Sequence, residues 1–294
     1  MMQDKYNFQI RSFYIMENNF YTPAEIIDHN INGEITKANL PTGKMILLGI
    51  MAGAFIAIGG AASNVVVHSI SNTGLARILA GTIFPIGLML IVVLGGELFT
   101  GNCLMLMAFL DKKISASSLL RNLVIVYFSN LIGALIIDIL IFFSGQLSYS
   151  SGVLGAYTIK VALTKAQISP VNALASGILC NLLVCLAILM ASASKDISGK
   201  ILAIFFPICT FVICGFEHCI ANMFYIPTGM MAASHPDYAA KAEELYGISA
   251  IQCSELISIA STKSFLFVTI GNIIGGMLFV GVVFYAVHKV KWKA

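Results

Sequence analysis

The sequence predicts an all-α membrane protein with six transmembrane helices, of which the second and fifth are broken near their middle. Its 294 residues are 58% hydrophobic and 11% charged, with a mean hydropathy of +0.90, which is too apolar for a soluble domain of this length. Two apolar segments are too long for one simple helix, and each carries a glutamate near its centre. The two halves of the chain also share a motif, which indicates an internal repeat.

Six apolar segments are each near the ~20 residues that a helix needs to cross a hydrocarbon core of about 30 Å. We therefore divide the chain into an N-terminal segment (1–44), one transmembrane domain (45–288) and a short C-terminal tail (289–294). The apolar segments span residues 45–69, 78–110, 118–144, 171–194, 199–232 and 264–288.

The N-terminal segment predicts one short surface helix. Residues 1–15 lack an apolar core and a small-residue cleavage site, so we do not expect a secretory signal there, and Met16 is a second plausible start. Thr22, Pro23 and Glu25 form a capping pattern for a helix. That helix is amphipathic, and we expect it to lie at the membrane surface.

The lysines and arginines between the apolar segments favour six spans with both termini in the cytoplasm, because positive charge accumulates on that side. In this orientation the outside carries only Arg77, Lys160, Lys165, Lys241 and Lys263. The inside carries Lys5, Arg11, Lys37, Lys44, Lys112, Lys113, Arg121, Lys195, Lys200, Lys289, Lys291 and Lys293.

Most of the seven cysteines fall in apolar segments, where cysteine behaves as a small hydrophobe. Cys209, Cys214 and Cys219 recur every five residues, about 140° apart on a helix, so they do not share a face as metal ligands would. No basic run is interleaved with aromatic residues. We therefore expect no disulfide framework, no metal, no cofactor and no nucleic-acid partner.

Two motifs recur in the two halves. GELFTGN (96–102) in the second segment matches GFEHCIAN (215–222) in the fifth: a glycine, a glutamate, an aromatic residue and a closing asparagine. The pattern Asn-x-Ile-Gly occurs at 130–133 in the third segment and at 272–275 in the sixth. Because three spans separate the copies, the second half must be inverted relative to the first. The repeats cover about residues 45–145 and 171–288.

A helix broken at glycine exposes backbone N–H groups and a helix N-terminus, which stabilise an anion. Such irregular backbone occurs at membrane depth only where it lines a cavity or is buried in protein. We interpret Glu97 and Glu217 as acceptors of backbone N–H bonds that brace the two breaks, with Asn102 and Asn222 closing the motifs. Carboxylates that line a cation path are the alternative interpretation.

His218 is the only histidine within the core of an apolar segment, since His29, His68, His235 and His288 fall in connections or at helix ends. A histidine can carry a proton near neutral pH. The repeat places it opposite Phe99 and Thr100, whose hydroxyl could orient the ring. A single buried histidine is otherwise usually a hydrogen-bonded core residue. Lys165, just before the fourth segment, is either an interfacial lysine or a group that attracts anions to the pore mouth.

Together with six spans, CGFEHCIANM (214–223) is a specific signal. The sequence after Met16 resembles the formate/nitrite transporter family, which consists of pentameric channels for small monovalent anions. The resemblance implies an aquaporin-like fold in which each protomer has its own pore and the broken helices meet at a central histidine. By motif, His218 matches that histidine, Thr100 matches the threonine of the first break, and Lys165 matches the vestibule lysine.

The same resemblance implies two apolar constrictions, an outer one formed by Phe84 and Phe211 and an inner one formed by Leu88, Leu98 and Phe99. A bare anion in a dry apolar constriction costs many kcal/mol, whereas its neutral conjugate acid does not. The anion would therefore be stabilised or protonated between the two constrictions.

The resemblance implies a homopentameric anion channel in the lipid bilayer of the cell membrane. The motif GELFTGN is most similar to the hydrosulfide channel subgroup, so hydrosulfide is the favoured anion, and we expect formate and nitrite to permeate as well.

Two other functions compete with a channel. A proton-coupled secondary transporter of formate or nitrite shares the inverted repeat, but the apolar segments lack the chain of ionisable residues that is typical of a proton relay. Asp138 is the only other intramembrane candidate, and we assign it no role. An intramembrane enzyme would use His218 with Cys214 or Cys219. Cys219 projects about 100° away from His218 on a helix, and no third orienting residue is evident. We therefore expect no enzyme activity.

Overall fold

The structure is a computed structural model that describes residues 20–258 and 263–292. The second start at Met16 lies outside these residues. All elements of the described part are helical apart from one isolated bridge, and six helices are long and apolar enough to cross a membrane. The predicted fold class is therefore confirmed. The six spans are Thr42–Val67 (α3), Thr73–Leu94 (α4 and α5), Ala116–Phe143 (α8), Pro170–Ala193 (α10), Ile197–Cys214 (α11) and Ser264–Lys289 (most of α15, then η3 and α16).

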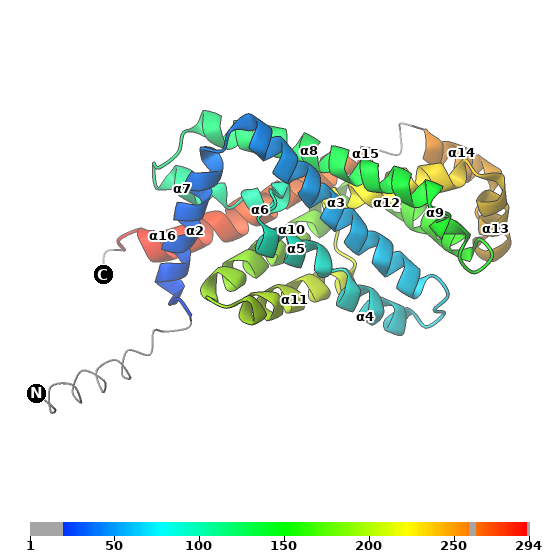
Figure 1. The fold of residues 1–294 in the computed structure, drawn as a ribbon, viewed down its shortest axis with the longest axis horizontal. Coiled ribbons are helices and arrows are strands. Elements are labelled where there is room, and N and C mark those ends of the chain that lie inside the picture. The colour runs from blue at the N-terminus through cyan, green and yellow to red at the C-terminus, as the bar shows by residue number, and fades with distance from the viewer. Residues whose placement is uncertain (1–19, 259–262, 293–294) are drawn as a thin grey trace, which may run out of the picture.

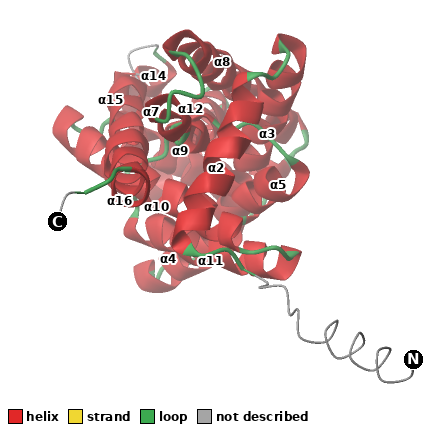
Figure 2. Ribbon diagram, turned by 90° about the vertical axis from the view of Figure 1, so that its left-hand side faces the viewer, coloured by secondary structure: helices red, strands yellow, loops and turns green. Residues whose placement is uncertain are grey.

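The two described ends of the chain lie on one face of the molecule, which we call the terminal face, and the opposite face is the distal face (Figure 1). An ion pair joins Asp28 of α2 (Pro23–Ala38) to Lys289 at the end of α16 (Val283–Lys289). Viewed from the terminal face, α2 crosses in front of the bundle (Figure 2). The first and last described helices therefore meet on this face.

Helix α2 is held at both its start and its buried side. The predicted capping box is present, since Glu25 Oε2 accepts hydrogen bonds from the backbone N–H and the hydroxyl of Thr22 at 2.8 and 2.7 Å. The backbone N–H of Tyr21 donates to the carbonyl of Ala193 at 2.8 Å. The apolar stripe of α2 packs on α10 and α7, which fixes this helix against the transmembrane bundle.

Both predicted breaks occur at the motif residues. In the first half the chain leaves regular helix over residues 95–98, and in the second half it does so over residues 215–218. The helices that follow the breaks run to opposite faces, as an inverted repeat requires. After the first break, residues 99–110 lead to the terminal face, where α8 begins, and after the second break, residues 219–233 lead to the distal face (Figure 1). The helices around the breaks are α4 (Thr73–Ile83), α5 (Ile86–Leu94), α6 (Phe99–Asn102) and α7 (Met105–Leu110), and then α11 (Ile197–Cys214) and α12 (Cys219–Ala233).

The connections on the distal face contain helices that the hydropathy pattern did not predict. The 14 residues of α9 (Val153–Ala166) are too few to cross a membrane, yet Leu154 and Ile159 are buried, and the helix packs along α12. Helices α13 (Pro236–Tyr246) and α14 (Ala250–Ile257) complete this side of the molecule (Figure 1). The distal face is therefore a folded layer built on the spans. The last span comprises α15 (Lys263–Ile273), the π-helical stretch η3 (Ile274–Val282) and α16.

Within each repeat, glycines allow two helices to approach at backbone distance. A Cβ atom added at Gly133 of α8 would lie 1.9 Å from the carbonyl oxygen of Ile50 in α3. The counterpart in the second half is Gly275, where an added Cβ would lie 2.2 Å from the carbonyl oxygen of Ile178 in α10. Contacts of this type need glycine because any side chain would separate the backbones.

We expect the substitution Gly133→Ala to lower the free energy of unfolding by about 1–3 kcal/mol, because α3 and α8 must move apart. Gly43→Ala, in the first turn of α3, is the matched control, since nothing lies within 4 Å of an added Cβ there. Denaturation of the full-length protein in detergent measures both variants. Equal stability of the two variants would contradict this packing.

Candidate functional site

The two breaks have the same backbone shape. Gly95 ends α5 with φ at +88°, and Gly215 ends α11 with φ at +73°. Residues with a Cβ rarely adopt such angles, so glycine permits the turn at both places. Extended residues follow, and new helices begin at Phe99 and Cys219. The breaks therefore bring two helix N-termini into the middle of the bundle.

One asparagine braces the first break. The Asn130 side chain of α8 accepts a hydrogen bond from the backbone N–H of Phe99 at 3.0 Å. Its amide group donates to the carbonyl oxygens of Glu97 and Gly49 at 2.9 and 2.8 Å. This side chain thus replaces helix hydrogen bonds that the break removes, and it joins the break to α3.

Asn272 of α15 does the same at the second break. It accepts from the backbone N–H of Cys219 at 2.8 Å and donates to the carbonyl oxygens of Glu217 and Gly177 at 3.0 and 2.8 Å. Both asparagines belong to the repeated pattern, but the sequence did not predict this bracing role. Their recurrence in the third and sixth segments was the signal that could have identified them.

The two break glutamates bind side chains. Glu97 Oε2 accepts from the amide groups of Asn102 at 2.7 Å and Asn122 at 3.5 Å. Glu217 Oε2 accepts from the amide group of Asn222 at 2.8 Å. The prediction that these carboxylates accept backbone N–H bonds is therefore wrong. The side chains of Asn130 and Asn272 accept the backbone N–H bonds at the two breaks instead. Glutamate and closing asparagine nevertheless pair within each motif.

Thr100 and His218 meet where the breaks face each other. The Thr100 hydroxyl lies 3.0 Å from Nε2 of His218, and both side chains are buried. Nδ1 of His218 accepts the backbone N–H of Ala221 at 3.1 Å and so caps α12. A neutral ring with an accepting Nδ1 carries its proton on Nε2. That proton then points to the Thr100 oxygen, which leaves the threonine hydroxyl hydrogen available to another acceptor.

Lys165 contacts the second break. A lysine that only extends to the membrane interface would not make this contact. It lies in the last turn of α9, and its Nζ is 2.9 and 3.0 Å from the two carboxylate oxygens of Glu217. The same Nζ lies 5.1 Å from the centroid of the Tyr225 ring. The lysine is thus fixed beside His218 by a carboxylate and an aromatic ring.

A cavity of about 790 Å³ opens on the distal face, and we call it the distal vestibule. Its lining includes Phe84, Phe211 and His218, so it reaches the Thr100–His218 pair. The rings of Phe84 and Phe211 are 5.6 Å apart in an edge-to-face contact, and Phe211 stacks on His218 at 6.0 Å. The charged lining residues are Arg77, Lys160, Lys165 and Glu217.

A smaller cavity of about 250 Å³, the terminal vestibule, lies between α2 and the first break. Leu88 and Leu98 line it, and both side chains are buried, as is Phe99, whose ring packs edge-to-face on Tyr127 at 4.9 Å. Of the predicted constriction residues, Phe84 and Phe211 therefore line the distal vestibule and Leu88 and Leu98 line the terminal vestibule, whereas Phe99 lines neither. The charged lining residues are Glu34, Lys37 and Glu97.

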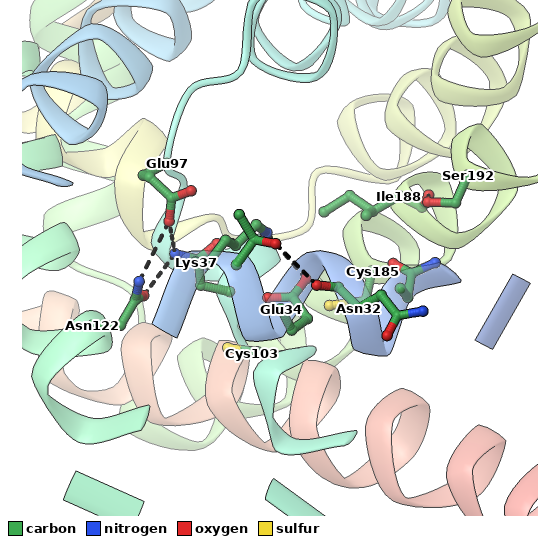
Figure 3. A network of polar contacts seen from close by, with 12 residues as sticks. Asn32, Glu34, Lys37, Glu97, Cys103, Asn122, Cys185, Ile188 and Ser192 are labelled. Carbon is green, nitrogen blue, oxygen red and sulfur yellow. Dashed lines mark hydrogen bonds and ion pairs between the residues drawn. The ribbon is translucent and has the colours of Figure 1, made fainter. Parts of the chain in front are cut away.

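Lys37 is a site residue that the sequence did not predict. Its Nζ lies 3.0 Å from Oε1 of Glu34 (Figure 3). The same Nζ lies 3.1 Å from Oδ1 of Asn102. Asn102 in turn binds Glu97, so Lys37 reaches the first break as Lys165 reaches the second. Its position on a helix outside the repeats hid this correspondence from the sequence.

Comparison with known proteins identifies the family. The sequence profile "Formate/nitrite transporter" matches residues 24–286. The chain belongs to the formate/nitrite transporter family. A probable formate transporter of Methanothermobacter thermautotrophicus is 36% identical, over 92% of this chain and 98% of its own. A formate channel of Haemophilus influenzae is 34% identical, over 89% and 92% of the two chains.

Solved structures share the fold. A pentameric formate channel with formate bound is similar with a TM-score of 0.74 and 32% identity, over 84% of this chain and 97% of that chain. An ion channel of the same family has a TM-score of 0.76 at 24% identity and supports the fold alone. The protein is therefore a multi-pass membrane protein of a transport family and is not an enzyme.

We expect Asn272→Ala to lower the free energy of unfolding by about 1–3 kcal/mol for each buried polar group that it leaves unpaired. Anion flux should fall with it, because α12 loses the contact that fixes its first turn. Asn172→Ala, at an exposed position near the start of α10, is the matched control. Denaturation in detergent and flux in proteoliposomes measure the two effects, and a variant as stable as wild type would exclude the bracing role.

Proposed function

We propose that the protein is a channel for small monovalent anions, with formate as the first candidate. The observation that carries the proposal is the contact between Thr100 and His218 where the two breaks face each other. The distal vestibule reaches this contact, and apolar side chains surround it. A hydroxyl and an imidazole in an otherwise apolar layer form a binding point for one small polar solute. The surrounding apolar side chains disfavour hydrated cations.

The proposed path begins in the distal vestibule, where three cationic side chains face one carboxylate and attract anions. At Phe84 and Phe211 the anion takes up a proton from the water of the distal vestibule, loses its hydration shell and continues as the neutral acid, because a bare anion costs many kcal/mol in this layer. Thr100, oriented by Nε2–H of His218, donates its hydroxyl hydrogen to the solute. Beyond Leu88 and Leu98 the acid loses its proton in the terminal vestibule.

The identity of the anion is part of the proposal. The relatives from H. influenzae and M. thermautotrophicus are named for formate, which supports formate for this chain. Hydrosulfide, favoured from the motif GELFTGN, is the second candidate because it is protonated near neutrality and needs little help from the protein. Nitrite is the third candidate. All three are small and have a neutral conjugate acid.

We also propose the assembly and the orientation. The pentameric state of the formate channel with a similar fold supports a homopentamer with one pore in each protomer. The distribution of lysine and arginine supports a cytoplasmic terminal face, with residues 1–44 and 289–294 on that side of the cell membrane and 45–288 as a single channel domain.

A proton-coupled secondary transporter is the second candidate function. It would need a titratable group linked to the solute path. Asp138 of α8 is buried, and its Oδ1 accepts a hydrogen bond from Thr228 at 2.8 Å, so it binds a helix neighbour outside both vestibule linings. Saturation at low substrate and turnover far below channel rates would favour this candidate.

The test is flux of formate, hydrosulfide and nitrite into proteoliposomes over a pH series. We expect His218→Asn to lower formate flux by about twofold to tenfold and to change its pH dependence. Thr100 loses the Nε2–H bond that orients it, and a lost hydrogen bond between neutral groups is worth about 0.5–1.5 kcal/mol. His288→Asn, the same substitution at the end of α16, is the control. Wild-type protein that moves none of the three anions would refute the channel.

A further inference from the structure

The vestibule lysines differ in their counterions. Lys165 pairs with the break glutamate Glu217, whose two oxygens are occupied by that lysine and by Asn222. Lys37 pairs instead with Glu34, which lies one turn away on its own helix. The break glutamate of the first half, Glu97, is held by the amide groups of asparagines. The terminal vestibule thus contains one carboxylate more than the symmetry of the repeat requires.

Glu34 is placed as a bound anion would be. Its side chain is only 2% exposed, it lines the terminal vestibule, and Oε1 accepts the hydrogen bond from Lys37. Its other oxygen, Oε2, is buried and has no hydrogen-bond partner among the described residues. In Figure 3, Glu34 lies on one side of Lys37, and Glu97 and Asn122 lie on the other. Among the described residues, Glu34 thus uses only one of its two oxygens, on Lys37.

We propose that Glu34 is a tethered competitor for the anion at Lys37, so that an anion reaches Lys37 from the terminal face only when Glu34 is protonated or displaced. This inference rests on the proposed function and adds a residue that controls access to the pore from one side. With Glu34 ionised, two carboxylates face one lysine and repel a permeating anion. With Glu34 neutral, Lys37 is free to bind it.

The surroundings of Glu34 support titration in the neutral range. Burial raises the pKa of Glu34 to about 7, and Lys37 acts against this shift. The other titratable groups near it are Glu97 of the break, Cys185 of α10 and Cys103 after α6. His29 of α2 also lines the vestibule, and on α16 Lys289 is already paired with Asp28. With this pKa, about one Glu34 in ten is protonated at pH 8 and about nine in ten at pH 6.

The test compares E34Q with wild type in inside-out membrane vesicles, whose outer surface exposes the terminal face. E34Q keeps the size and one hydrogen-bond acceptor of glutamate but removes its charge. At low formate concentration we expect uptake by E34Q to be about tenfold faster than wild type at pH 8 and nearly equal at pH 6, because access scales with the fraction of neutral Glu34. The ratio of the two proteins at each pH removes the effect of pH on formate itself.

Two controls isolate the site. D28N removes a carboxylate from the exposed side of the same helix, and we expect it to leave the uptake ratio near one at both pH values. In a K37M background, E34Q should no longer accelerate uptake, because the competitor has lost its target. Equal rates of E34Q and wild type at pH 8, or the same acceleration in D28N, would overturn the proposal.

A second measurement does not need flux. A group whose folded pKa is raised loses stability as pH rises from its unfolded value toward its folded value. Wild-type protein in detergent should therefore lose stability relative to E34Q between about pH 4.5 and 7, and parallel stability profiles would also overturn the proposal. Wild-type vesicles that move no anion would refute the channel itself, while the stability profile would still test the titration that the inference requires.

Discussion

Backbone polar groups in an apolar layer must be paired, and the rest of the structure depends on how that requirement is met at the two breaks. Each break removes helix hydrogen bonds, and other groups of the protein replace them. Asn130 and Asn272 supply both a donor and an acceptor at these points and bind a neighbouring helix with the same side chain. The close glycine contacts serve the same end, because they bring the asparagine-bearing helices near enough to reach the breaks.

The repeat provides the scaffold, and departures from the repeat provide the chemistry. Glutamate and asparagine pair identically in the two halves. His218 has no titratable counterpart, because Leu98 occupies the equivalent place directly before the helix that follows the first break. The His218 ring caps the helix after the second break and contacts the Thr100 hydroxyl at the start of the helix after the first break. It therefore links the two halves at a single point. A symmetric pair of histidines would place two titratable rings in a layer that stabilises few charges.

Sequence alone predicted the parts of this molecule that depend on periodicity and repetition. The six spans, the two breaks and the pairing of Thr100 with His218 follow from hydropathy and from the alignment of the halves. The contacts of Lys165 with Glu217, and of Lys37 with Asn102, do not follow, because each lysine lies on a helix outside the repeated spans. Such contacts depend on how α9 and α2 pack, and no local pattern of apolar residues encodes which polar side chains they bring to the pore.

The two mouths of the pore differ in charge. Three cationic side chains face one carboxylate in the distal vestibule, whereas Lys37 faces Glu34 and Glu97 in the terminal vestibule. This difference can change how fast an anion is captured from each side, but a passive pore cannot change the equilibrium between the two sides. If the solute crosses as a neutral acid, each anion is accompanied by one proton, and the final distribution depends on the anion and proton concentrations alone. The charge asymmetry therefore acts on the rate of exchange, and a carboxylate that titrates in a vestibule, as proposed for Glu34, would change the rate of conduction without determining the direction of net transport.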